Sequence, residues 1–285
     1  MEIIAAIGYK KIDLLEKLPH LSLFPDECDP VALKAAAEAY GLQIANLATY
    51  PGGGLDGRKK AWLAHSWQVP NPERFTNCGF SSDDPAELER ELEQLYRAID
   101  LAVFFGSRSI RVVAGSDDPE TLDKMVPWFQ RGAEYAAERN IYMGFENHNA
   151  NAYLGLGTDS VGIAGQPELC VELVEKVGSS YFGVLYEPHN FMAEAVFDYR
   201  TALEIMKDHI VHCHFKDGAP TGDGYPAGDG YGLTPMGEGE IDFPWIVEQL
   251  DAVGYDGDFT LEYEIHTAPS EAGLRQFYEA FAAMR

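Results

Sequence analysis

Short runs of apolar residues alternate along this chain with longer segments in which apolar residues recur at helical spacing. Runs of the first kind are typical of buried strands, and segments of the second kind are typical of helices that cover a sheet. The pattern predicts strands over residues 44–50, 109–114 and 141–147, and within 182–190, 209–217 and 259–266. Residues 11–15 read as a short strand or the start of a helix.

Aspartate–proline pairs begin helices at residues 29, 84 and 118, because aspartate is a good N-cap and proline fits the first turn. Gly41 and Gly106 are expected to end the first two helices, and Pro127 to kink or split the third. Further helices are expected over residues 166–177, 191–207, 243–253 and 270–284.

The regular alternation of strands and helices predicts an α/β fold, a (β/α)8 TIM barrel, with residues 1–285 as a single domain. The pattern contains only seven clear strands, so the first strand is atypical or missing. Either residues 1–7 supply it, or the chain begins inside the first helix. Such a barrel carries its active site at the carboxyl ends of its strands.

Four of the predicted strands end in side chains that bind metals or transfer protons. In the strand over residues 141–147, alternation of side chains places Glu146 and His148 on one face. Glu187, His214 and Glu262 lie late in the next three strands. Three carboxylates and one imidazole are suitable ligands for a divalent cation. The sequence therefore predicts a metal site at the mouth of the barrel.

Several of these assignments have alternatives that the pattern does not decide. As a buried carboxylate, Glu146 would otherwise form an ion pair, with Arg111 as the candidate partner. His212 and Glu264 share the strand parity of the two candidate ligands beside them. His148 is either a second base next to the metal or a hydrogen-bonding partner of the following loop.

The composition excludes some partners. With 46 acidic and 21 basic residues the formal charge is −25, which repels a nucleic-acid backbone and is expected of a soluble acidic surface. The cysteines are scattered without a CxxC pair, which predicts reduced thiols in a cytoplasmic protein. The first apolar stretch is too short for a signal peptide, and no run approaches the ~18 residues of a membrane span.

Two irregular segments are expected to lie near the strand ends. Residues 58–83 contain His65 and Trp67, which form either a substrate wall or ordinary packing. Residues 217–240 are rich in glycine but lack a nucleotide-binding motif, so we expect a loop that closes over a substrate.

An ordered set of motifs carries a family resemblance: FENH at 145–148, YEPHN at 186–190, HCHFKD at 212–217, GEGEID at 237–242 and LEYE at 261–264. With these, most of the chain from about residue 30 resembles the xylose isomerase-like barrel superfamily of sugar phosphate isomerases and epimerases. The resemblance implies a divalent metal, Mn²⁺ first and Mg²⁺, Co²⁺ or Zn²⁺ as alternatives, on the fifth to eighth strands. Its ligands would be Glu146, Glu187, His214 and Glu262.

The resemblance also implies a chemistry. Glu146 and Glu262 would remove and return a proton on a carbon next to a carbonyl, while the metal polarises that carbonyl and stabilises the enediolate. The leading hypothesis is therefore a metal-dependent isomerase or epimerase of sugars.

The chain departs from the family pattern at three positions. The second ligand is usually Asp and here is Glu187, and Asn190 stands where many relatives have His, with His189 one place earlier. Pro220 stands where ketose epimerases carry Arg, which leaves Lys216 as the nearest cation. Because no basic cluster indicates a phosphate clamp, we expect an uncharged sugar, polyol or keto-sugar. The residues expected to bind it are Lys216, His189, Asn190, His65 and Trp67.

Three other functions compete with this hypothesis. A lyase or dehydratase would use the same metal-polarised ketone and a base to expel a substituent, as in related subunits that cleave keto-sugar C-glycosides, and His148 favours it. An abasic-site endonuclease would need more histidine ligands and a less acidic surface. A non-catalytic binding protein on the same fold is the third. The sequence leaves open a homo-oligomer or a second type of subunit.

Overall fold

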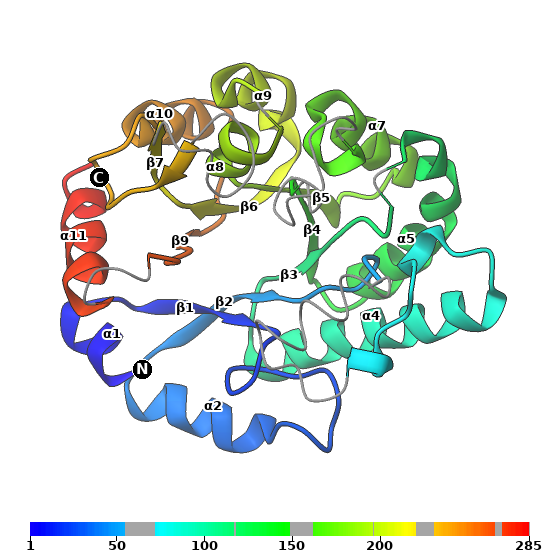
Figure 1. The fold of residues 1–285 in the computed structure, drawn as a ribbon. Coiled ribbons are helices and arrows are strands. Elements are labelled where there is room, and N and C mark those ends of the chain that lie inside the picture. Colours follow the sequence, from blue (N-terminus) through cyan, green and yellow to red (C-terminus); the bar gives the residue numbers. More distant parts are fainter. Residues whose placement is uncertain are drawn as a thin grey trace.

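A parallel sheet of seven strands forms the inner wall of the protein, and helices surround it (Figure 1). The computed structural model describes residues 1–54, 72–116, 118–148, 162–195, 197–220, 231–265 and 270–284. Within them the barrel strands are β1 (Lys11–Leu15), β2 (Gln43–Ala48), β3 (Ser109–Val112), β4 (Tyr142–Glu146), β5 (Phe182–Tyr186), β6 (Ile210–Phe215) and β9 (Phe259–Leu261). Their order follows the chain, so the TIM-barrel prediction is confirmed.

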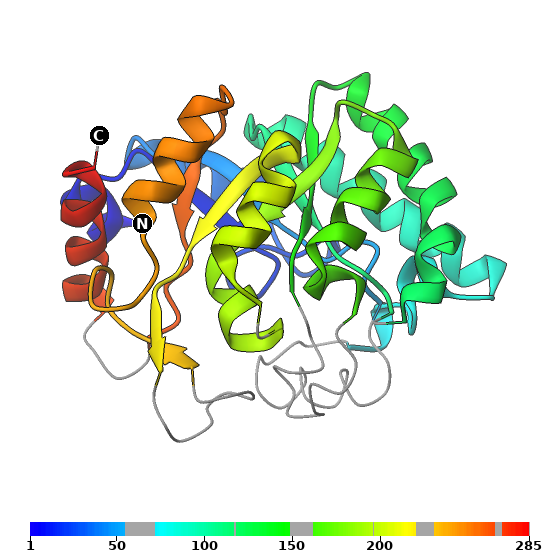
Figure 2. The same cartoon turned by 90° about the horizontal axis from the view of Figure 1, so that it is seen from above.

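Helices follow the strands and stand beside them, as the view from above shows (Figure 2). They are α1 (Glu2–Ile7), α2 (Pro30–Ala39), α4 (Pro85–Phe105), α5 (Leu122–Ala137), α7 (Pro167–Val177), α8 (Pro188–Asn190), α9 (Tyr199–Met206), α10 (Phe243–Ala252) and α11 (Ser270–Ala282). Short 3₁₀ turns span Pro72–Arg74, Gly79–Ser81, Pro119–Thr121, Ile163–Gly165 and Lys207–His209, and a π turn spans Phe191–Ala195. None of the helices in these ranges has the length and apolar character of a membrane span.

The aspartates and the glycine predicted to begin and end helices are found at the ends of α2 and α4. The side chain of Asp29 accepts hydrogen bonds from two backbone N–H groups of α2, and Asp84 caps α4 in the same way. Gly106 ends α4 in the left-handed conformation that glycine adopts without strain. The expected helix over residues 191–207 is divided, because the side chain of Asp198 starts α9 anew. The helix α5 continues through Pro127.

Residues 1–7 do not supply a strand, so that alternative was wrong. Glu2–Ile7 is the helix α1, which packs against α11: the ring centroids of Tyr9 and Tyr278 lie 5.1 Å apart. The Tyr9 hydroxyl also donates a hydrogen bond to the Leu274 carbonyl at 2.8 Å. The first strand of the described sheet is therefore β1, and the candidate ligands lie at the ends of its fourth to seventh barrel strands.

The sheet has one seam, between β1 and β9, where the described residues form no ladder of backbone hydrogen bonds. Side chains bridge this seam instead. Lys11 Nζ lies 2.7 Å from an Asp258 carboxylate oxygen, and the Thr260 hydroxyl donates a hydrogen bond to Asp13 Oδ2 at 2.9 Å. The barrel is thus closed by polar contacts on one side.

The apolar core lies between the sheet and the helices, so the outward faces of the strands are apolar. Phe145 of β4 and Phe182 of β5 are buried, and both rings contact Phe129 of α5. Because side chains alternate along a strand, the neighbours of these residues point into the barrel. Glu146 at the end of β4 is one of them.

Two register shifts adjust which residues face the interior, one between β1 and β2 at Ile12 and Asp13, and one between β5 and β6. Between β5 and β6, Val184 pairs with Ile210 but Leu185 pairs with His212, so Val211 is an extra residue. Such a bulge turns the following side chains of a strand. The space for it comes from Gly183, since a Cβ atom there would lie 2.4 Å from the His209 carbonyl oxygen.

A methyl group at Gly183 should therefore destabilise the barrel. We expect Gly183→Ala to lower the free energy of unfolding by about 1–3 kcal/mol, as overpacking does, because the obstructing atom belongs to the backbone. Gly144→Ala, on the paired position of β4, is the matched control: its Cβ would contact a side chain at 3.0 Å. Urea unfolding measures both variants, and equal small losses would contradict this account.

Candidate metal centre

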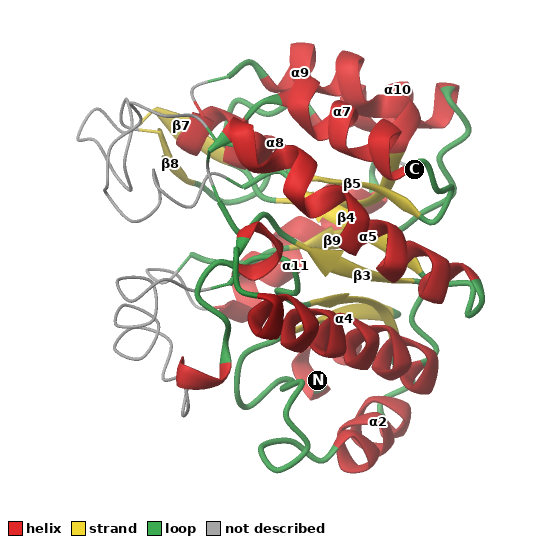
Figure 3. Cartoon of the chain, turned by 90° about the vertical axis from the view of Figure 1, so that its right-hand side faces the viewer, coloured by secondary structure: helices red, strands yellow, loops and turns green. Residues whose placement is uncertain are grey.

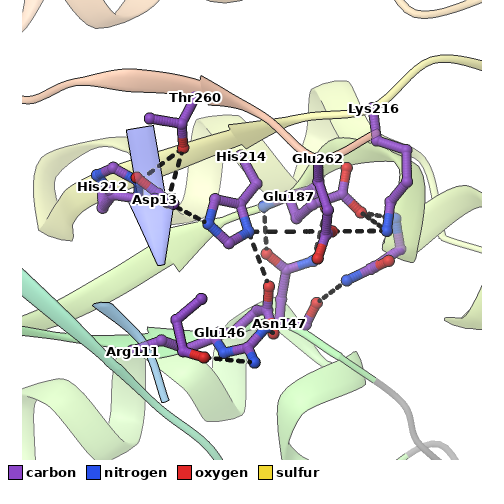
Figure 4. A network of polar contacts seen from close by, with 12 residues as sticks. Asp13, Arg111, Glu146, Asn147, Glu187, His212, His214, Lys216, Thr260 and Glu262 are labelled. Carbon is purple, nitrogen blue, oxygen red and sulfur yellow. Dashed lines mark hydrogen bonds and ion pairs between the residues drawn. The ribbon is translucent and has the colours of Figure 1, made fainter. Parts of the chain in front are cut away.

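Three predicted ligands come together inside the barrel, at the carboxyl ends of β4, β6 and β9. Glu146 Oε1 lies 3.1 Å from His214 Nδ1, which lies 4.0 Å from Glu262 Oε2. All three ligand atoms are within 4.8 Å of one another. Figure 4 shows these side chains directed toward the same point. Strand parity did not separate His212 from His214 or Glu262 from Glu264 as ligands. In the structure, His214 and Glu262 are the members of this cluster.

The spacing of these atoms suits one divalent cation. Two ligand atoms bound to one ion through bonds of about 2.1 Å lie no more than about 4.2 Å apart. The separations of 3.1 and 4.0 Å fall within this limit. Two carboxylates and one imidazole suit Mn²⁺, Mg²⁺ and Zn²⁺ alike, so the donor set accepts an ion without selecting it.

Glu146 is held from both sides. Arg111 of β3 donates to Glu146 Oε2 at 3.0 Å, so the ion pair considered from the sequence exists together with the His214 contact. Burial raises the pKa of Glu146, but the charges of Arg111 and His214 outweigh it and hold the pKa well below its usual value. The Arg111 side chain is fixed in turn by the carbonyls of Ala48 and Thr49. Glu146 is therefore a rigid carboxylate.

His214 contacts a carboxylate with each ring nitrogen. Its Nε2 lies 3.1 Å from Asp13 Oδ2, opposite the Glu146 contact of Nδ1. Burial lowers the pKa of His214, but the hydrogen bonds to Asp13 and Glu146 and the charge of Glu262 raise it to about 10. This shift favours the protonated imidazole, whose positive charge offsets part of the negative charge of the carboxylates around it.

Lys216 supplies a second positive charge beside the cluster. Its Nζ lies 2.7 Å from Glu262 Oε2, 2.9 Å from Glu264 Oε2 and 3.9 Å from Glu187 Oε2. Burial lowers the pKa of Lys216, and the three glutamates together raise it well above its usual value. Glu264 thus pairs with this lysine, whereas Glu262 is shared between Lys216 and the His214 cluster.

Glu187 lies beside the three-residue cluster and is engaged with its own backbone. Its two carboxylate oxygens accept the N–H groups of His189 and Asn190 at 3.0 and 2.7 Å, so it caps α8. The Asn147 side chain pairs with the Glu187 backbone at both its N–H and its C=O. Burial raises the pKa of Glu187 to about 8, which Lys216 opposes.

Of the remaining predicted site residues, the structure describes His148, His189 and Asn190 but not His65 and Trp67. His148 interacts electrostatically with Glu146 and Lys216, and burial lowers its pKa, which favours a neutral imidazole. His189 is buried with its pKa lowered to about 3, again mainly by burial, and the Asn190 side chain donates to the Asn147 carbonyl. His65 and Trp67 lie outside the described residues.

The predicted glycine-rich loop begins with a hairpin on the same side of the barrel as the cluster. Strands β7 (Gly218–Pro220) and β8 (Tyr231–Leu233) pair antiparallel and project from the barrel (Figure 3). The Asp217 carboxylate accepts the N–H groups of Gly218, Gly237 and Gly239, which anchors both ends of the loop.

The sequence analysis missed Asp13, the polar residue in the middle of β1. The sequence shows only that Asp13 lies in an apolar run. Its hydrogen-bond partners are distant in the chain, with His214 201 residues away, so no local pattern predicts the contact. Glu16, just after β1, was missed for the same reason. It accepts the Tyr50 N–H at 2.9 Å through Oε2. Glu16 Oε1 is buried and has no hydrogen-bond partner in the part of the chain that the structure describes.

Comparison with known proteins places the chain in a family. Residues 1–284 match the family of xylose isomerase-like TIM barrel proteins. The chain belongs to this family. No curated protein matches the chain.

Solved structures of this fold match the whole barrel at low identity. A xylose isomerase-like TIM barrel protein from Mycobacterium smegmatis, in complex with magnesium, has a TM-score of 0.68 and 16% identity, covering 99% of this chain and 86% of its own. D-allulose 3-epimerase from Methylomonas sp., in complex with D-allulose, has a TM-score of 0.68 and 16% identity, covering 99% and 89%. A probable 3-DHS dehydratase from Bacillus anthracis has a TM-score of 0.64 and 15% identity, covering 98% and 91%.

The stability of the barrel mouth should depend on pH through Glu16. Burial raises the pKa of Glu16 in the folded protein to about 8, from an ordinary value of 4.5. Between these values the folded chain binds one more proton than the unfolded chain at this site, so stability falls as pH rises. We expect Glu16→Gln to be more stable than the parent at pH 8 by on the order of 2–4 kcal/mol, and no different at pH 4.

Urea unfolding at both pH values measures this difference. Glu93→Gln, at an exposed position of α4, controls for a general effect of charge. If the two variants change in parallel with pH, the Glu16 carboxyl is not the group responsible.

Proposed function

We propose that this protein is a divalent-metal-dependent isomerase or epimerase of an uncharged keto-sugar. The supporting observation is the buried convergence of Glu146, His214 and Glu262 at the carboxyl end of the barrel. The family membership and the sugar epimerase among the structural matches agree with this proposal. When bound there, the ion would polarise the substrate carbonyl and lower the cost of the negative charge that develops on it.

The two glutamates would move the proton, in unequal surroundings. The Glu262 side chain is 23% exposed and follows β9 at the mouth, whereas Glu146 is 1% exposed and fixed by Arg111. Glu262 is therefore the more accessible of the two to a carbon next to the carbonyl, and Glu146 would serve the opposite face of the substrate. An acid and a base on opposite faces return the proton with inverted configuration.

Lys216 would donate to a substrate oxygen from the side of the cluster. Because Glu264 holds its ammonium group at 2.9 Å, Lys216 keeps a partner when Glu262 turns toward an ion or a substrate. His189 and Asn190 would line the same side, since their backbone N–H groups surround Glu187. We propose His65 and Trp67 as further contacts from the segment that follows β2.

A lyase or dehydratase is the second candidate. The low pKa of the His148 imidazole provides a neutral base close to Glu146, and a dehydratase is among the structural matches. In that reaction the enediolate expels a neighbouring substituent instead of taking the proton back. The two functions therefore share the first step and differ in the second.

Removing any one ligand should weaken metal binding. We expect Glu146→Gln, His214→Gln and Glu262→Gln each to reduce Mn²⁺ affinity by more than about 100-fold, since even outer partners of a metal site change affinity by 10–100-fold. Calorimetric titration of chelator-treated protein measures the affinity, and Glu248→Gln on the exposed side of α10 is the control.

Glu187→Gln decides whether this residue is the fourth ligand. A loss as large as that of Glu146→Gln would make it a ligand, and a loss below about tenfold would leave it a cap of α8. Unchanged binding in all three single-ligand variants would refute the proposed centre.

Solvent deuterium should separate the candidate reactions. Incubating the Mn²⁺-loaded protein with D-fructose or D-allulose in deuterated water, we expect one deuterium on the carbon next to the carbonyl in both the epimer and the recovered sugar. Mass spectrometry and NMR detect it. Glu262→Gln should abolish epimerisation, because a proton-transfer group then remains on only one face of that carbon.

Loss of a water or another leaving group from the sugar would instead indicate the lyase. Tight metal binding without any exchange across a panel of ketoses would argue for the non-catalytic alternative.

A further inference from the structure

One carboxylate oxygen of Asp13 on β1 lies within hydrogen-bond distance of side chains from three other strands. Asp13 Oδ2 lies 3.1 Å from His212 Nε2, 3.1 Å from His214 Nε2 and 2.9 Å from Thr260 Oγ1 (Figure 4). It also lies 3.2 Å from Asn46 Nδ2. These residues belong to β6, β9 and β2. The site lies deeper in the barrel than the cluster of Glu146 and Glu262, and His214 connects the two.

The protons in this network can be assigned from its neighbours. Ser109 donates its hydroxyl to Asn46 Oδ1 at 2.9 Å, so the Asn46 amide turns its N–H toward Asp13. The Thr260 hydroxyl is also a donor to this oxygen. Asp13 therefore acts as an acceptor throughout, and a neutral His214 must carry its proton on Nε2 to hydrogen-bond with it.

We propose that Asp13 is a positioning residue that keeps the proton of His214 on Nε2 and thereby presents the lone pair of Nδ1 to the metal ion. This inference rests on the proposed metal centre. A carboxylate behind a metal-binding imidazole fixes both the tautomer and the ring orientation, and it makes the ring a better donor to the ion. Here the carboxylate comes from β1, which supplies none of the proposed ligands.

A second ion held by Asp13, His212 and His214 is the competing interpretation, because their ligand atoms also lie within 4.8 Å of one another. The hydrogen bonds favour the positioning role. A neutral imidazole has one lone pair, so His214 cannot give Nδ1 to one ion and Nε2 to another. Asp13 Oδ2, the oxygen that contacts both histidines, already accepts the Asn46 and Thr260 donors, whereas Asp13 Oδ1 has no hydrogen-bond partner in the part of the chain that the structure describes.

Asp13 also joins β1 to β9 through Thr260, so its loss will affect stability whatever its role. The ion pair of Lys11 and Asp258 crosses the same seam without contacting His214. Lys11→Ala is therefore a matched control for weakening the seam. Thr260→Val is a second control, because it removes one donor from Asp13 and leaves the contact with His214 in place.

The decisive experiment compares Asp13→Asn with these two controls and the parent. Mn²⁺ titration should show a 10–100-fold loss of affinity for Asp13→Asn, and affinity unchanged within about threefold for both controls. NMR of ¹⁵N-histidine-labelled protein loaded with Mg²⁺ reports the tautomer of His214. The parent should show the proton on Nε2, and Asp13→Asn should lose or broaden that signal.

Each other outcome overturns the inference in a recognisable way. If the parent binds Mn²⁺ and Asp13→Asn binds it equally well with the same tautomer, Asp13 has only a structural role. If the parent binds two ions and Asp13→Asn binds one, the second-ion interpretation is correct. If the parent binds no ion, the proposed metal centre fails, and the role of Asp13 fails with it.

Discussion

The fold depends on a balance of charge inside the barrel. Burying an isolated carboxylate is costly, and Glu146, Glu187 and Glu262 would repel one another if nothing opposed them. Arg111 and Lys216 oppose them directly, and the raised pKa of His214 adds a third positive group. These positive groups offset part of the negative charge inside this acidic protein, where Asp13 and Glu264 are further carboxylates in contact with His214 and Lys216.

The same contacts bear on the proposed metal centre. If Glu262 and His214 bound an ion there, Glu262 would leave its shared contact with Lys216. Glu264 then retains the lysine, and Arg111 retains Glu146. The fixed side of the centre is thus formed by β3 and β4, and the adjustable side by β6 and β9. In the proposed reaction the two proton-transfer groups would therefore differ, with Glu146 fixed in place and Glu262 able to change partners.

The sequence was sufficient to predict what depends on local pattern. Alternation within β4 put Glu146 on the inner face, and aspartate–proline pairs located the starts of α2 and α4. It was insufficient wherever a position depends on a partner strand. The extra residue Val211 in β6 and the space left for it by Gly183 arise only when the two strands pair. Strand parity alone could not separate His212 from His214 for the same reason.

The seam between β1 and β9 shows the same limit in another form. Within the described sheet, β1 and β9 are neighbours without a ladder of backbone hydrogen bonds. The residue pattern of either strand therefore does not predict that the two strands lie side by side. Two side-chain contacts join them: the ion pair of Lys11 with Asp258, and the Asp13 carboxylate, whose Oδ2 accepts hydrogen bonds from Thr260 of β9 and from Asn46 of β2. A carboxylate that closes the wall of the barrel is thereby placed behind His214. If Asp13 positions His214 as proposed, one residue contributes both to the barrel wall and to the metal centre, and Asp13→Asn changes both.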